Sequence, residues 1–244
     1  MIFSTIRRII AERLRRRLGF PLQELALERL RQTGFQPHLL LDVGASSGLF
    51  ADEAWTYWPE MAVHCFEPDA ECVQVLQDRA RRDPRLTVTR TLVGAREVSS
   101  QSYFYQLGGS TLFKEHSSAD PQVPATAIGP VRSCRMITLD GYCQERRISP
   151  DFLKIDVQGY ELEVLRGAER ILPGIEVILS EVNHIDVYEG VPLAAELIAW
   201  LAQHGYALHD VCNFMRRPLD SALWQSDMIF VKQTSPLRAS KTWK

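Results

Sequence analysis

Short apolar runs alternate with stretches of helical periodicity along most of the chain. Apolar runs bounded by turn residues are typical of buried strands, whereas apolar residues spaced three or four apart indicate helices. Five runs predict strands, at residues 39–43, 62–66, 86–93, 152–157 and 175–181. Between them, helical spacing predicts helices at 48–57, after Pro68-Asp69, before Pro173-Gly174 and at 193–204. Strands at 206–211 and 227–232 follow one another with no helix between them, so we expect this last pair to be antiparallel.

This alternation predicts one α/β domain over residues 37–233, with a mostly parallel sheet covered by helices on both faces. Ligands bind such sheets at the carboxyl ends of the strands, so polar residues there are the candidates for function. The segments outside the alternation are two helices in an N-terminal extension (1–36), at 2–18 and 22–33, a long loop of lid or substrate-binding type at 107–131, an additional strand at 132–138, a short helix at 139–147 and a flexible tail at 234–244.

Composition narrows the class of protein. The chain has 244 residues, of which 45% are hydrophobic and 24% charged, as in ordinary globular domains. A chain of this length buries about 70–75% of its unfolded surface and needs no disulfide or metal for stability. No run of about 18 apolar residues is present, so we expect no transmembrane helix. The five cysteines form no Cys-x-x-Cys pair, which favours reduced thiols and a cytoplasmic location.

The net charge of −2 is unevenly distributed. Residues 1–20 contain six arginines and one acid, a net charge of +5, which leaves −7 for the rest of the chain. The acidic body argues against a nucleic-acid partner. The basic helix at 2–18 has an imperfect apolar face and suits either peripheral contact with an anionic membrane or dimerisation. The alternative is a solvated helix that packs loosely on the domain.

The first chemical motif follows the first predicted strand and reads Asp42-Val43-Gly44-Ala45-Ser46-Ser47-Gly48. Glycines here allow a tight turn and a close approach of the backbone to a ligand. The spacing is neither G-x-G-x-x-G nor a P-loop, and no Lys-Ser/Thr pair follows to hold a phosphate. The loop therefore suits a ligand with an adenosine part but no phosphate. The alternative is a plain strand-to-helix turn.

Glu67 ends the second predicted strand, where a carboxylate can accept both hydroxyls of a ribose. Pro68 follows it, so the alternative is an acidic residue that favours the start of a helix. The preceding glycine loop strengthens the ribose interpretation, because both features lie at the carboxyl edge of the expected sheet.

Four further polar residues lie in or after later strands. Lys154 and Asp156 interrupt an apolar run, where they are costly to bury without partners. Glu181 and His184 follow the next strand, and a carboxylate or imidazole near a substrate hydroxyl can act as a general base. Asp156 could instead cap the following helix, and His184 could be an exposed loop residue. A metal site formed by Asp156, Glu181 and His184 is also conceivable, but nothing in their spacing fixes a coordination geometry, so we expect no metal.

Together these stretches resemble the FkbM family of S-adenosylmethionine-dependent methyltransferases, over about residues 39–232. The most specific part is LKIDVQGYELEVLRGAERIL at 153–172, which is similar to the family hallmark KIDvqG-E--VL-Ga. DVGASSG resembles the family's DVGAN-G, with Ser46 in place of the usual Asn; FEPD resembles FEP, and GGSTL resembles the S-SL element. Relatives usually carry a small residue and Asp after the third strand. This chain has Val93-Gly94-Ala95-Arg96 there, so an adenine contact must come from backbone groups or from elsewhere.

The resemblance implies a class I methyltransferase fold, a Rossmann-like three-layer sandwich whose seven strands have the order 3-2-1-4-5-7-6 with the last strand antiparallel. It also implies an S-adenosyl-L-methionine-dependent O-methyltransferase that acts on a hydroxyl of a sugar, glycolipid or related natural product. The cofactor-binding residues it implies are Asp42, Gly44, Ala45, Gly48, Glu67, Pro68, Val93, Ser110 and Asp156. The candidate catalytic residues are Asp156, Glu181 and His184.

Two other functions remain open at this point. An NAD-dependent oxidoreductase would share the ribose-binding acid, although the third glycine of its fingerprint is missing. A non-catalytic module that binds S-adenosylmethionine would share the whole cofactor site. Sequence alone does not identify the acceptor.

Overall fold

The computed structural model describes residues 22–105, 110–113, 130–240 and 242. The basic helix predicted at 2–18 and most of the long loop predicted at 107–131 lie outside these residues. Within them, no helix is both long enough and apolar enough to cross a membrane.

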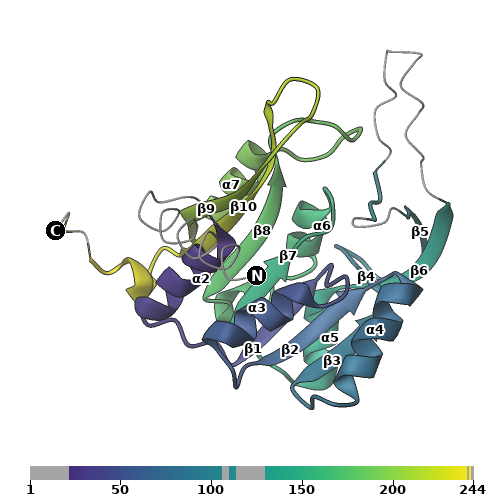
Figure 1. Ribbon diagram of the computed structural model, residues 1–244, viewed down its shortest axis with the longest axis horizontal. Helices are drawn as coiled ribbons and strands as arrows, with labels where there is room; N and C mark the ends of the chain where they lie inside the picture. Colours follow the sequence, from purple (N-terminus) through teal and green to yellow (C-terminus); the bar gives the residue numbers. More distant parts are fainter. Residues whose placement is uncertain (1–21, 106–109, 114–129, 241, 243–244) are drawn as a thin grey trace, which may run out of the picture.

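A twisted sheet of seven strands forms the middle of the fold (Figure 1). Its order is β3-β2-β1-β7-β8-β10-β9, and the neighbours from β3 to β8 are parallel. β10 is antiparallel to both β8 and β9. This confirms the predicted order 3-2-1-4-5-7-6 with an antiparallel final strand. The strands are β1 (Leu39–Val43), β2 (Ala62–Glu67), β3 (Leu86–Arg90), β7 (Phe152–Ile155), β8 (Val177–Asn183), β9 (Tyr206–Arg216) and β10 (Leu223–Lys232).

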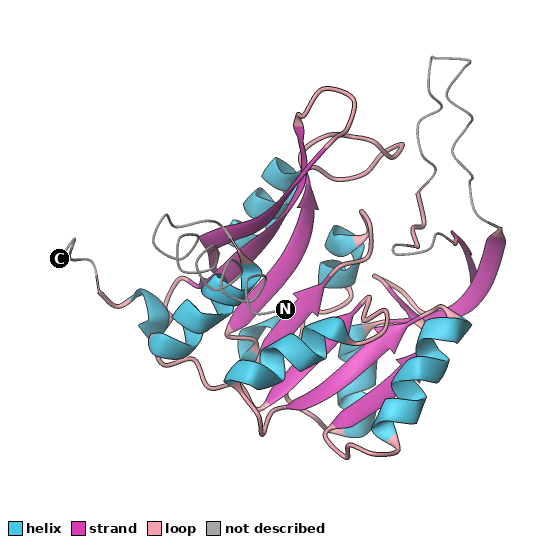
Figure 2. Ribbon diagram, viewed as in Figure 1, coloured by secondary structure: helices cyan, strands magenta, loops and turns pink. Residues whose placement is uncertain are grey.

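Helices cover both faces of this sheet and complete three layers (Figure 2). Successive side chains of a strand point to opposite faces, so a strand buried on both sides must be apolar throughout. In β1, Leu39 and Leu41 join one core cluster and Leu40 joins the other. One face carries α2 (Gln23–Gln32), α3 (Leu49–Tyr57) and α4 (Ala70–Ala80); the other carries α5 (Leu139–Arg146), α6 (Glu161–Arg166) and α7 (Ala194–Gln203).

The prediction of the third strand, at 86–93, is wrong at its C-terminal end. β3 stops at Arg90, and β4 (Leu92–Val93) enters a separate sheet of order β4-β6-β5, with β5 at Val98–Phe104 and β6 at Val131–Ile137. The buried Thr91 lies at the change of partner: its backbone N–H still donates to Glu67 O of β2, whereas its hydroxyl donates to Arg135 O of β6. The sequence pattern did not predict β5, whose residues are mostly half-buried or exposed.

Three other segments differ from expectation. The helix after β7 ends at Arg166, where Gly167 packs so closely on Gly94 that an added Cβ would lie 2.1 Å from its carbonyl oxygen. α2 joins the core of the domain through Leu27 and Leu30, although it lies within the predicted extension. In the predicted tail, Pro236–Arg238 form a 3₁₀ helix, and Leu237 packs against the same core cluster.

Candidate active site at the carboxyl edge of the sheet

The chain order reverses on either side of β1, because β2 and β3 extend the sheet one way and β7 and β8 the other. Such a switch point opens a crevice beyond the carboxyl ends of the strands. The glycine loop after β1 enters this crevice, and its first turn depends on Gly44, which has φ of 77°. A Cβ at Gly44 would lie only 1.8 Å from the carbonyl oxygen of Asp156, so the residue must be glycine for the loop to pass the end of β7.

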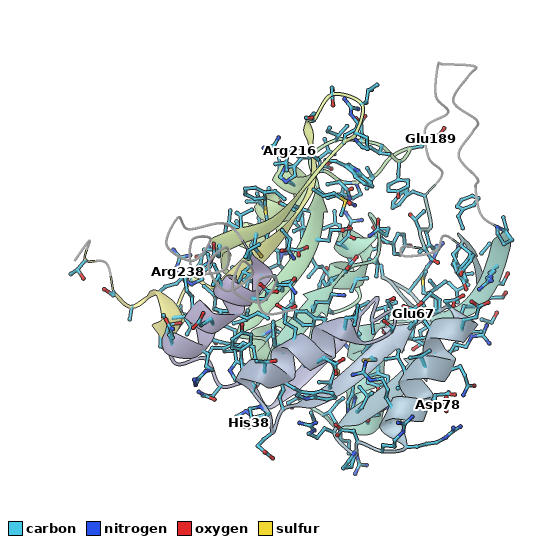
Figure 3. All side chains as sticks on the ribbon, in the orientation of Figure 1. His38, Glu67, Asp78, Glu189, Arg216 and Arg238 are labelled. Atoms are coloured by element: carbon cyan, nitrogen blue, oxygen red, sulfur yellow. The ribbon has the colours of Figure 1, made fainter. Side chains whose placement is uncertain are left out.

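Glu67 lies at the carboxyl end of β2, as labelled in Figure 3, and its carboxylate joins two loops. Oε2 accepts a hydrogen bond from Ser46 N at 2.8 Å, and Oε1 accepts one from Asp69 N at 2.9 Å. Burial raises the pKa of Glu67, and these two backbone donors act in the opposite direction. A carboxylate offers about four acceptor positions, so roughly two remain for a ligand.

Glu67 lines a first pocket, here called the Glu67 pocket. It includes the predicted residues Gly44, Pro68, Val93, Ser110 and Asp156. Among the described residues that line it there is no lysine or arginine. The remaining lining residues are Val43, Ser46, Phe66, Asp69, Cys72, Thr91, Leu92, Tyr105, Leu112, Val157 and Gln158.

Tyr105 forms a wall of the Glu67 pocket that sequence reasoning missed. The Arg132 guanidinium stacks 3.6 Å from the centre of its ring and pairs with Asp69, whose carboxylate caps α4. This contact holds an aromatic ring in the lining of the pocket that also contains Val93, which follows the strand after which relatives were expected to carry an Asp. Tyr105 follows β5, an element that the hydrophobic pattern did not reveal, so no sequence signal pointed to it.

Lys154 lies behind the glycine loop and is almost completely buried. Its Nζ donates to Gly44 O at 3.1 Å and lies 3.2 Å from Asp42 Oδ1 and 3.5 Å from Asp156 Oδ2. Burial alone would lower the pKa of Lys154, but the two carboxylates outweigh it and raise that pKa. Lys154 therefore stays charged and connects the loop to both acids. Asp42 lines neither pocket and acts only through this ammonium.

A second pocket, here called the acidic pocket, adjoins the first and shares Gly44, Ser46 and Asp156 with it. Four carboxylates line it, from Glu53 on α3, Asp156 after β7, Glu181 on β8 and Asp227 on β10. Its one lysine or arginine among the described residues is Lys154, whose charge Asp42 and Asp156 already offset. The other lining residues are Gln23, Ala45, Leu49, Phe50, Asn213, Met215, Gln225 and Ser226.

Two glutamine amides hold the carboxylates at the junction of the pockets. Gln158 adopts a left-handed conformation (φ 53°), and its Nε2 donates to Asp156 Oδ1 at 3.2 Å and to Glu181 Oε2 at 3.0 Å. Gln225 Nε2 donates to the same Glu181 oxygen at 3.0 Å. Burial and the nearby Asp156 charge raise the pKa of Glu181 well above its usual value. The strained backbone of a non-glycine residue at Gln158 is a frequent mark of a functional site.

The structure brings together two of the three predicted catalytic residues. Asp156 and Glu181 both line the acidic pocket, whereas His184 lines neither pocket and holds its Nε2 2.8 Å from Ser226 Oγ. Gly48 also lies outside both pockets, where an added Cβ would lie 2.7 Å from the Arg79 guanidinium. Ala45 lines the acidic pocket only. Among the described residues, no three His, Cys, Asp or Glu side chains are arranged to hold a metal ion.

Comparison with known proteins identifies the family of the chain. The methyltransferase FkbM domain matches residues 42–208, which contain the glycine loop, Glu67, Asp156 and Glu181. The 2-O-methyltransferase NoeI of Sinorhizobium fredii is 26% identical over 171 residues, covering 65% of this chain and 69% of NoeI. A crystal structure of methyltransferase FkbM from Methylobacillus flagellatus superposes with a TM-score of 0.51 at 18% identity, covering 79% of this chain and 43% of that one. This chain thus spans less than half of that solved protein and shares its fold, and it belongs to the FkbM family of methyltransferases.

Proposed function

We propose that this protein is an S-adenosylmethionine-dependent O-methyltransferase that modifies a hydroxyl group of a carbohydrate, glycolipid or related natural product. The observation that carries the proposal is the meeting of two pockets at Asp156, one suited to a nucleoside and one suited to a polar acceptor. The name of the relative NoeI, a 2-O-methyltransferase, supports transfer to oxygen.

The Glu67 pocket fits S-adenosylmethionine by its chemistry. A ribose would bind the acceptor positions that Glu67 leaves free, and an adenine would pack among Leu92, Val93 and Tyr105. The lack of a lysine or arginine among the described lining residues fits a cofactor without phosphate. The carboxylate of Asp156, at the border of both pockets, would favour the positive charge of a sulfonium.

When bound, S-adenosylmethionine supplies an activated methyl group on a good leaving group. The chain must then align an acceptor oxygen with that methyl group and take up the hydroxyl proton. We assign the proton to a carboxylate oxygen of Asp156, whose side chain is 40% exposed and lies 3.5 Å from Lys154 Nζ through Oδ2. The buried Glu181, with its raised pKa, would instead donate a hydrogen bond to another oxygen of the acceptor.

Calorimetry with S-adenosylhomocysteine and with NAD tests the cofactor. Binding of S-adenosylhomocysteine without NAD is expected, and the reverse would favour the oxidoreductase. A mass-spectrometric screen of glycans and lipid-linked glycans with methyl-labelled S-adenosylmethionine then tests the reaction. Cofactor binding without methylation of any acceptor in a broad screen would favour a non-catalytic module.

A further inference from the structure

A β-bulge shapes the wall of the acidic pocket. Met215 of β9 pairs with Gln225 of β10, and Cys212 pairs with Asp227, so two residues of β9 oppose the single residue Ser226. One of the two, Asn213, has a left-handed backbone with φ of 51°. Bulges turn side chains toward new directions and are frequent beside active sites. This one places both Asn213 and Met215 in the lining of the acidic pocket.

Amides, rather than cations, hold the carboxylates of this wall. Asn213 Nδ2 donates to Asp227 Oδ2 at 2.7 Å and to Gln23 Oε1 at 3.1 Å, and Gln23 Nε2 donates to Glu53 Oε2 at 2.6 Å. Glu181 is only 7% exposed, and among the described residues the hydrogen bonds to its side chain all reach Oε2. Its Oε1 is therefore free for a ligand. An anionic ligand would meet carboxylates here, whereas hydroxyl groups would find both acceptors and donors.

The same pocket has an apolar border. Leu49, the first residue of α3, is 75% exposed, and Met215 is 49% exposed, and both line the acidic pocket. Large exposed apolar side chains at the edge of a polar pocket are typical of ligand-binding sites, because covering them removes apolar surface from water. Leu49 comes from α3 and Met215 from β9, so the two belong to different walls.

We propose that the acidic pocket binds an amphipathic acceptor, with an uncharged hydroxyl-bearing head inside and an apolar chain across Leu49 and Met215. This inference rests on the proposed function and makes its acceptor more specific. The head reaches Asp156 beside the Glu67 pocket, where its hydroxyl meets the methyl donor. The carboxylates of Glu53 and Asp227 then select against acceptors whose head carries phosphate or carboxylate.

The NMR signal of the Met215 methyl group would report directly on contact with the apolar chain of the acceptor. Protein labelled with ¹³C-methyl methionine and saturated with S-adenosylhomocysteine would be titrated with n-octyl β-D-glucopyranoside, below its micellar concentration, and with methyl β-D-glucopyranoside. We expect the octyl glycoside to bind about tenfold more tightly, the gain from covering roughly 60 Å² of apolar surface. We also expect it to shift the Met215 signal but not that of the buried Met61.

Variants test whether Leu49 and Met215 cause the tighter binding of the octyl glycoside. The double substitution Leu49→Ser/Met215→Gln should remove the tenfold preference for the octyl chain, measured by ligand-observed NMR. Leu219→Ser is the matched control, because Leu219 is 82% exposed yet lines neither pocket. Equal binding of the two glycosides, an unmoved Met215 signal or an equal loss in the control would overturn the inference. S-adenosylhomocysteine binding is measured in the same samples, so failure of the cofactor assignment would be seen separately.

Discussion

Replacing Lys154 with methionine tests whether one buried ammonium organises both the fold and the site. The substitution keeps the length and apolar stem of the side chain. It removes the charge that lies 3.2 Å from Asp42 Oδ1 and the donor to Gly44 O. Asp42 is fully buried, and neither of its oxygens has a hydrogen-bond partner among the described residues, so the ion pair is its compensation.

The loss of stability in Lys154→Met follows from the lack of any other partner for Asp42. Breaking a buried ion pair by removing one partner costs about 3–5 kcal/mol, a large part of the roughly 5–15 kcal/mol that stabilises a typical domain. Burial already raises the pKa of Asp42, and Lys154 opposes this, so its loss raises that pKa further. A carboxyl with a raised folded-state pKa stabilises the fold at low pH. That stability falls by about 1.4 kcal/mol per pH unit between the unfolded and folded pKa values.

The Lys154→Met variant should therefore lose more stability relative to the wild type at pH 8 than at pH 5, as measured by urea unfolding followed by circular dichroism. Adding Asp42→Asn removes the uncompensated charge and should restore much of the loss at pH 8. Lys232→Met, which removes a lysine at the surface beside Glu176, should cost about 1 kcal/mol or less. A deficit independent of pH, or a double variant less stable than the single one, would refute this reasoning.

Three further substitutions test the site itself. Glu67→Ala removes the acceptor for Ser46 N and Asp69 N and should weaken S-adenosylhomocysteine binding about tenfold to a hundredfold by calorimetry; unchanged affinity would contradict the ribose assignment. Asp156→Asn should lower methyl transfer by about 10²–10⁴-fold while the protein stays folded, and near-normal turnover would remove Asp156 from the mechanism. Gly44→Ala should cost about 3 kcal/mol or more in thermal or urea unfolding, because its Cβ would overlap Asp156 O, whereas Gly174→Ala, with its nearest atom at 3.5 Å, should be tolerated.

The middle of the central sheet was predictable because β1, β7 and β8 are buried on both faces. The run at 39–43 is apolar except for Asp42, and the run at 152–157 is apolar except for Lys154 and Asp156, because a strand between two helical layers must exclude water on both faces. Elements at the edge of the fold lack such continuous apolar runs. β5 exposes much of its surface, and Thr91, which separates β3 from β4, makes hydrogen bonds to residues far away in the chain.

The sequence likewise predicted some residues of the candidate site and not others. Gly44, Glu67, Asp156 and Glu181 all lie at or near the carboxyl ends of strands of one sheet, so their positions at one edge could be predicted from the strand pattern. His184 was expected with them, but its ring bonds to Ser226 and it lines neither pocket. The amides of Gln158 and Gln225 were not expected, because one depends on a left-handed turn and the other on the register of β10 with β8.

The amino-acid sequence by itself determined the layered α/β architecture, the strand order implied by the family resemblance and the acids at the carboxyl edge. The architecture and the acids follow from hydrophobic periodicity and from local motifs, which are properties of neighbouring residues, whereas the strand order came from the resemblance alone. Only the tertiary structure decided that Lys154 joins Asp42 to Asp156, that Tyr105 lines the Glu67 pocket and that a bulge places Met215 in the acidic pocket. Each of these joins side chains distant in sequence, and such contacts depend on packing and register rather than on any local pattern.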